Sequence, residues 1–171
     1  SKETQITSFD PLLDLTVNGR LALSNVVLAG IPLNARAGFS WQGHVFSLSR
    51  CRLDLRRSYL ILDLIYGKTA TLDGSLEGVV DLAVLQDYKI NIGETGGLVG
   101  FAARFQGSGE DPLITAAFWI NKLHFNEINL DSISGSAYYA RNRLMLLKPL
   151  QIIDAKNIYA LSGTAEVFPE D

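Results

Sequence analysis

The sequence is poor in charge and in cysteine. Asp, Glu, Lys and Arg make up 19% of its 171 residues, below the average of about 25%. Its 15 Lys and Arg stand against 18 Asp and Glu, a formal net charge of −3. The lack of a basic excess argues against a nucleic-acid-binding surface, and we expect no nucleic-acid partner. The single cysteine, Cys51, excludes a disulfide framework within the chain.

No apolar run is long enough to span a membrane as a helix. Residues 26–33 already contain a glycine and a proline, and they are far fewer than the ~20 that such a helix needs. Residues 1–5 are polar and precede no apolar core, so the sequence shows no signal peptide. Because the chain lacks an initial Met and ends abruptly at residues 170–171, we expect a segment of a longer protein.

The sequence also lacks residues grouped for catalysis or metal binding. His44 and His124 have no second His or Cys at ligand spacing, and each is better interpreted as a solvent-facing or hydrogen-bonded strand residue. Cys51 falls on the apolar side of its predicted strand, where a free thiol behaves as a small hydrophobe. The glycines of residues 93–100 precede no helix pattern that would bind phosphate. We therefore expect neither an enzyme, nor a metal site, nor a cofactor.

What the sequence does contain is alternation of apolar and polar residues. In residues 50–56, Cys51, Leu53 and Leu55 fall on one side and charged residues on the other. Successive side chains of a strand point to opposite faces, so this pattern predicts a half-buried strand. Residues 60–64 and 101–106 repeat it, and 47% of the chain is apolar. The sequence therefore predicts a nearly all-β protein.

Short turn signals separate these runs and favour antiparallel neighbours. The only helix pattern covers residues 81–88, with Asp81 as its N-cap. The plausible corners or bulges are Asn18-Gly19, Gln42-Gly43, Asp73-Gly74, Gly96-Gly97 and Arg141-Asn142.

A weak internal repeat relates residues 17–66 to residues 120–167. Val17-Asn18 and Ile120-Asn121 each precede a similar run of alternating apolar residues. This relation predicts two similar units stacked along one continuing sheet, within a single unit of residues 1–171.

Two interpretations of the apolar strand positions remain open. They could fill the interior of a β-sandwich, which the composition favours, or line a curved sheet whose concave face stays partly open. The arginines Arg50, Arg52, Arg56 and Arg57 also allow two interpretations. A polar strand face is favoured over a site for lipid headgroups.

The order of elements resembles the TamB/AsmA-like superfamily. Residues 73–85 (DGSLEGVVDLAVL) are similar to its glycine-containing strand followed by Asp-Leu and further leucines. Residues 106–112 (QGSGEDP), before the strand of residues 113–120, resemble its junction of glycine, acidic turn and proline. Residues 120–139, 144–152 and 159–167 resemble its succession of short strands.

This resemblance implies a curved antiparallel sheet that forms an open, taco-like groove with an apolar interior and at most one short helix. Members are bacterial envelope proteins related to the bridge-like lipid transfer proteins. The resemblance further implies a periplasmic chain whose full-length protein is anchored in the inner membrane. It would carry phospholipid or another acyl lipid between the inner and outer membranes, and an outer-membrane barrel protein is a second expected partner.

A strand of about seven residues is roughly 23 Å long, comparable with part of a hydrocarbon core ~30 Å thick. A trough of that width could shelter acyl chains while the headgroups stay in water. A register slip of one residue would invert the assignment of faces. The expected groove residues are Leu21, Leu23, Phe39, Trp41, Leu48, Leu60, Leu62, Phe101, Phe105, Phe118, Leu144 and Leu146.

Two other functions remain as alternatives. One is an assembly chaperone that offers a sheet edge to the strands of an outer-membrane barrel. The other is a β-sandwich module that binds carbohydrate or protein.

Overall fold

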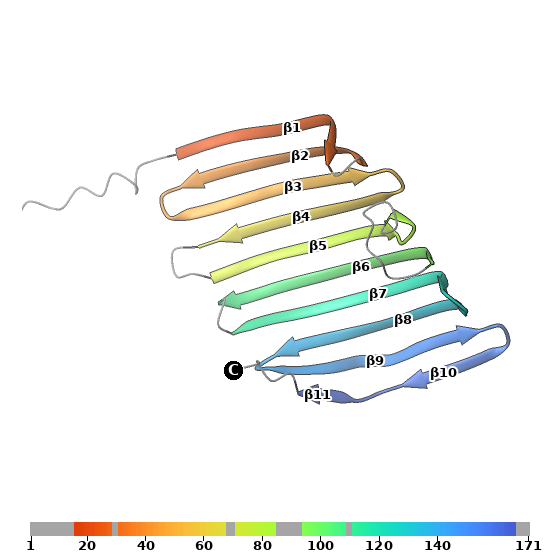
Figure 1. The fold of residues 1–171 in the computed structure, drawn as a ribbon. Helices are drawn as coiled ribbons and strands as arrows, with labels where there is room; N and C mark the ends of the chain where they lie inside the picture. Colours follow the sequence, from red (N-terminus) through yellow and green to blue (C-terminus); the bar gives the residue numbers. More distant parts are fainter. Residues whose placement is uncertain (1–15, 29–30, 68–70, 85–93, 109–110, 167–171) are drawn as a thin grey trace, which may run out of the picture.

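The computed structural model describes residues 16–28, 31–67, 71–84, 94–108 and 111–166 as one open antiparallel sheet of eleven strands (Figure 1). Sheet order follows chain order from β1 to β10, and β11 pairs with β9. The strands are β1 (Thr16–Leu28), β2 (Ile31–Gln42), β3 (Val45–Leu55), β4 (Ser58–Tyr66), β5 (Thr71–Asp81), β6 (Thr95–Ser108), β7 (Pro112–Phe125), β8 (Ile128–Ala140), β9 (Arg143–Asp154), β10 (Asn157–Leu161) and β11 (Thr164–Glu166). The predicted all-β, antiparallel fold is confirmed.

Tight turns explain why sequential strands are neighbours. Left-handed backbone conformations occur at Gly43 (φ 57°), Arg141 (φ 49°) and Asn142 (φ 58°), as short hairpin turns require. These residues lie between β2 and β3 and between β8 and β9, where the sequence predicted corners. Strands β1 to β9 have 9 to 14 residues. They are longer than the strand of about seven residues on which the sequence-based length estimate rested.

Two predicted turn signals lie inside strands instead. Gly19 is in β1 opposite Phe39, and Gly74 is in β5 opposite Phe105. A Cβ atom at Gly74 would lie 2.6 Å from Phe105 Cζ and 2.6 Å from the Asp63 carbonyl oxygen. Each glycine therefore makes room for an aromatic ring on the next strand. The Gly96-Gly97 signal does mark a bulge, because the β6–β7 register shifts between Gly96 and Leu98.

Half of the predicted helix of residues 81–88, residues 85–88, lies outside the described residues. Asp81 ends β5, and its carboxylate accepts a hydrogen bond from the backbone N–H of Ala83 at 3.1 Å. The Asp81 backbone N–H donates to Ser58 Oγ at 2.9 Å. The bond to Ser58 holds the end of β5 against the start of β4.

Extra residues in β1 and β3 are held by side chains of the next strand. Asn25 and Arg50 have positive φ angles of 55° and 48°, and the register shifts beside each of them. The Asn25 N–H donates to Asn34 Oδ1 at 2.9 Å, and the Arg50 N–H donates to Asp63 Oδ1 at 2.7 Å. Each bond satisfies a backbone donor that the bulge removes from the ladder.

A closed core is missing from the part of the chain that the structure describes. There, only Leu33 and Val84 are large apolar residues that are buried, each at 7% exposure. Two packed sheets would bury the inner residues of every strand, so the sandwich interpretation is wrong for these residues. The segments of the proposed repeat lie in the same sheet, and the repeat itself stays a prediction.

Replacing Gly74 with Ala is expected to destabilise the protein by about 1–3 kcal/mol, because the added methyl group overpacks against Phe105 and the Asp63 carbonyl. Urea unfolding followed by circular dichroism measures the change. The matched control is Gly163→Ala, since a Cβ there meets no atom within 4 Å. Equal stability losses in the two variants would contradict the proposed role of Gly74.

Candidate functional site: the apolar face of the sheet

The cross-strand register assigns the side chains to two faces, because residues directly opposite each other share a face. We call one of them the apolar face. From β1 to β9 it includes Val17, Gly19, Leu21, Leu23, Val26, Leu33, Ala35, Ala37, Phe39, Trp41, Phe46, Leu48, Cys51, Leu53, Leu55, Ser58, Leu60, Leu62, Leu64, Tyr66, Leu72, Gly74, Leu76, Gly78, Val80, Val99, Phe101, Ala103, Phe105, Gly107, Pro112, Ile114, Ala116, Phe118, Ile120, Ile133, Gly135, Ala137, Tyr139, Leu144, Leu146 and Ile152.

Charged side chains are absent from the apolar face as defined. Its most polar small residue, Ser58, is 3% exposed and accepts the hydrogen bond from the Asp81 N–H. Ser58 therefore exposes no unsatisfied hydroxyl group on this surface. The aromatic residues Trp41 and Phe46 are adjacent, with ring centroids 6.4 Å apart.

Every predicted groove residue lies on the apolar face, from Leu21 in β1 to Leu146 in β9. None of them is buried. Leu21 is 51% exposed and Phe39 is 37% exposed, values that are high for large apolar side chains. Sequence reasoning missed their neighbours on this face, such as Leu76 and Ile133, although the alternation within each strand marks them.

The bulge at Arg50 is needed for this separation of faces. Leu48 pairs with Leu64, and Cys51 pairs with Leu62, so Leu48 and Cys51 share the apolar face although three positions separate them. Without the extra residue, one of the two would point to the other side. The lone cysteine, Cys51, lies on the apolar face, as its strand pattern predicted.

The opposite surface, which we call the polar face, carries most of the charged and hydroxyl side chains of the strands. Arg143 and Glu166 form an ion pair there at 3.1 Å, and Arg104 lies 3.9 Å from Asp73. It includes Thr16, Asn18, Arg20, Ala22, Val27, Pro32, Asn34, Arg36, Gly38, Ser40, Gln42, Val45, Ser47, Ser49, Arg52, Asp54, Tyr59, Ile61, Asp63, Ile65, Thr71, Asp73, Ser75, Glu77, Val79, Asp81, Leu98, Gly100, Ala102, Arg104, Gln106, Ser108, Leu113, Thr115, Ala117, Trp119, Asn121, Ser132, Ser134, Ser136, Tyr138, Ala140, Arg143, Met145, Lys148, Gln151 and Ile153, with Glu166.

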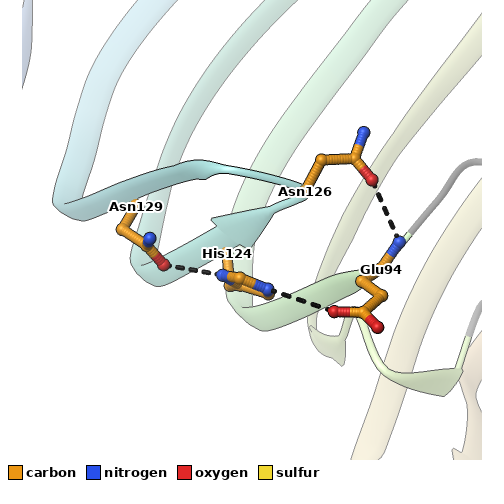
Figure 2. A network of polar contacts seen from close by, with 4 residues as sticks. All are labelled: Glu94, His124, Asn126 and Asn129. Atoms are coloured by element: carbon orange, nitrogen blue, oxygen red, sulfur yellow. Dashed lines mark hydrogen bonds and ion pairs between the residues drawn. The ribbon is translucent and has the colours of Figure 1, made fainter.

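His124 belongs to a polar network at one end of the sheet (Figure 2). Its Nδ1 lies 2.6 Å from Asn129 Oδ1, and its Nε2 lies 3.8 Å from a carboxylate oxygen of Glu94. The Glu94 backbone N–H donates to Asn126 Oδ1 at 3.2 Å. The network joins the start of β6 to the β7–β8 turn, which confirms His124 as a hydrogen-bonded strand residue.

The described residues contain no group of three or more His, Cys, Asp or Glu side chains placed to hold a metal ion. Among the same residues, no helix has the length and apolar character that crossing a membrane would require.

Comparisons with protein-family models, with curated proteins and with solved structures find no match to this chain.

Arg52 and Asp54 form the tightest ion pair of the polar face. Arg52 Nε donates to Asp54 Oδ1 at 2.8 Å, and Arg52 Nη2 lies 2.7 Å from the same oxygen. The hydrogen bond from Arg52, aided by the positive charges of Arg52 and Arg36, lowers the pKa of the Asp54 carboxyl below its ordinary 3.8. The pair is partly exposed, at 32% and 38% of the two side chains, so solvent weakens it.

Asp54→Asn is therefore expected to lose a small, pH-dependent contribution to stability. Because the folded-state pKa of Asp54 is lower than its unfolded value, the pair stabilises the protein above pH ~4 and stops doing so as the pH falls through the folded pKa. Urea unfolding at pH 7 and pH 3 measures the effect. The difference between the native protein and Asp54→Asn should shrink at pH 3; a constant difference would contradict the assignment.

Proposed function

We propose that this protein binds the acyl chains of phospholipids along the apolar face and forms part of a conduit that moves them between the inner and outer membranes of a bacterial envelope. The chain would act as a binding surface rather than as a catalyst, in the periplasm, within a longer protein anchored in the inner membrane. The resemblance of its sequence to the TamB/AsmA-like superfamily supports this proposal.

The single observation that carries the proposal is an apolar face continuous over nine strands that no second layer of the described residues covers. Soluble monomers rarely expose apolar patches above a few hundred Å². Large apolar side chains from Val17 to Leu144 stay partly exposed on this face. An exposed surface of this extent is expected to bind an apolar partner.

The energetics favour a lipid chain as that partner. Burying one methylene group is worth about 0.8 kcal/mol, so a chain of about 16 carbons covered on one side gains several kcal/mol. The 14-residue strands β6 and β7 are roughly 46 Å long at ~3.3 Å per residue. That length accommodates an extended acyl chain that lies along the strands.

The uniformity of the apolar face supports movement along it. Leucine, phenylalanine, isoleucine and valine side chains recur on successive strands from β1 to β9, and no charged group interrupts them. A lipid chain would therefore meet similar binding energies from strand to strand. Such a surface suits sliding better than storage at one site.

Replacing both Leu62 and Phe105 with Asp is expected to abolish lipid binding while the sheet persists, because two charges on the apolar face would need to be desolvated against a lipid chain. The purified chain is incubated with vesicles of phosphatidylethanolamine and phosphatidylglycerol, re-isolated, and examined by native mass spectrometry for bound phospholipid.

The matched control carries Asp at Ser75 and Ala102, which lie on the polar face of β5 and β6. Both side chains are exposed, so this variant adds the same charge without changing the apolar face. It should retain lipid. Equal lipid occupancy in the native protein and in a folded Leu62→Asp/Phe105→Asp variant would refute the proposal.

Cys51 offers a second, independent test. As the only cysteine, it can carry a polarity-sensitive fluorophore on the apolar face without further mutation. Phosphatidylglycerol vesicles should shift the emission to shorter wavelengths as lipid chains displace water around the label. In the control, Cys51→Ser/Ser75→Cys, the label is on the polar face of β5 and should respond little. Matching responses at the two positions would count against binding by one face.

A second candidate function, the presentation of an edge to strands of another protein, is favoured by β1. Within the described residues, β1 is hydrogen-bonded to β2 alone, over Thr16–Leu28. A long unpaired strand edge is a template for pairing. Leu62→Asp/Phe105→Asp leaves this edge unchanged, so strand capture that survives in that variant would identify the edge as the functional surface.

A further inference from the structure

A hollow of about 740 Å³ lies over β1 to β4 and is lined mainly by residues of the polar face. Its volume falls within the range of small-molecule sites. Four arginines from three strands line it: Arg20, Arg36, Arg50 and Arg52. Asp and Glu are absent from its lining. The hollow is therefore a basic site on an otherwise mixed surface.

The register places like charges side by side in this hollow. Arg36 in β2 is directly opposite Arg52 in β3, and Arg20 lies one strand further, opposite Gly38. Like charges directly opposite each other in a sheet are destabilising. Asp54 hydrogen-bonds Arg52, while no ion pair within the described part of the chain neutralises Arg20 or Arg36. The arrangement leaves an excess of positive charge that an anion would offset.

Arg52 is held in place before any ligand arrives. Asp54 bonds its guanidinium group from one side, and the Tyr59 ring lies beneath it, with Arg52 Cζ 4.8 Å from the ring centroid. Positioning of this kind lowers the entropy lost when the guanidinium binds a ligand. Arg36 also acts on Asp54, whose pKa it helps to lower, which places its charge near the same pair.

We propose that this hollow binds a phosphate group, carried either by a small soluble phosphate compound or by the headgroup of a lipid. The planar guanidinium fork donates two parallel hydrogen bonds to phosphate oxygens. Sequence reasoning considered Arg50 and Arg52 together with Arg56 and Arg57. The fold instead joins the first two with Arg20 and Arg36. The hollow also includes Leu21 and Ala37 of the apolar face. Arg36 lies on the polar face, and Leu62 and Phe105 do not line the hollow, so the variants that test the two proposals are separate and either proposal can fail alone.

Calorimetric titration of the full chain in low-salt, phosphate-free buffer tests the proposal with three probes: pyrophosphate, dihexanoyl phosphatidic acid, and dihexanoyl phosphatidylcholine as the zwitterionic control. Arg36→Gln should weaken binding about tenfold or more, the value of one lost charge-assisted hydrogen bond. The matched control, Arg104→Gln, removes the same charge from the polar face outside the hollow and should leave affinity within about twofold, as distant exposed charges are screened.

The melting temperature shows whether the Arg36→Gln variant is folded. Without phosphate, Arg36→Gln should melt at the same temperature as the native protein or higher, because it removes a like-charge pair. Pyrophosphate should then raise the melting temperature of the native protein more than that of the variant.

Binding of both pyrophosphate and phosphatidic acid supports a site for phosphate groups in general, and binding of phosphatidic acid without pyrophosphate assigns it to lipid headgroups. The proposal is overturned if neither binds, if phosphatidylcholine binds as well as phosphatidic acid, or if Arg104→Gln loses as much affinity as Arg36→Gln.

Discussion

The structure depends on one constraint, the antiparallel hydrogen-bond register that keeps alternating side chains in phase from strand to strand. A change of one residue in any pairing would reverse the faces of all later strands. The bulges at Asn25 and Arg50 preserve this phase. The side chains of Asn34 and Asp63 accept hydrogen bonds from the two backbone N–H groups that the bulges remove from the ladder. Separation of an apolar and a polar face is thus a property of the whole hydrogen-bond ladder.

In a single-layer sheet, the two faces can carry side chains of different chemical character. On the apolar face, cross-strand contacts such as Gly74 with Phe105 pack side chains against one another laterally, yet they cannot remove the outer surface from water. On the polar face, long arginine side chains can remain hydrated without a partner. The first surface fits a hydrophobic ligand and the second fits an anion, which is why we propose different ligands for the two sides.

Much of the fold was predictable because strand alternation is local. Cys51, Leu53 and Leu55 were expected on one side, and they share the apolar face. The errors concern glycine. Gly19 and Gly74 resemble turn residues in sequence, and their real role depends on an aromatic ring 20 or more residues away. Nothing local distinguishes a glycine that turns the chain from one that lies beneath Phe39 or Phe105.

The sequence alone determined which residues of a short run share a face, whereas the structure located the points where the phase changes. Two adjacent polar residues interrupt the alternation at Ser24-Asn25, Ser49-Arg50 and Asn121-Lys122, and in each pair the second residue adopts positive φ. Only the tertiary structure decided that the sheet stays one layer within the described residues and that Arg20, Arg36 and Arg52 meet. The physical reason is the distance in sequence between the interacting residues. Alternation is a property of adjacent residues, whereas register and layering depend on contacts between strands that are distant in sequence.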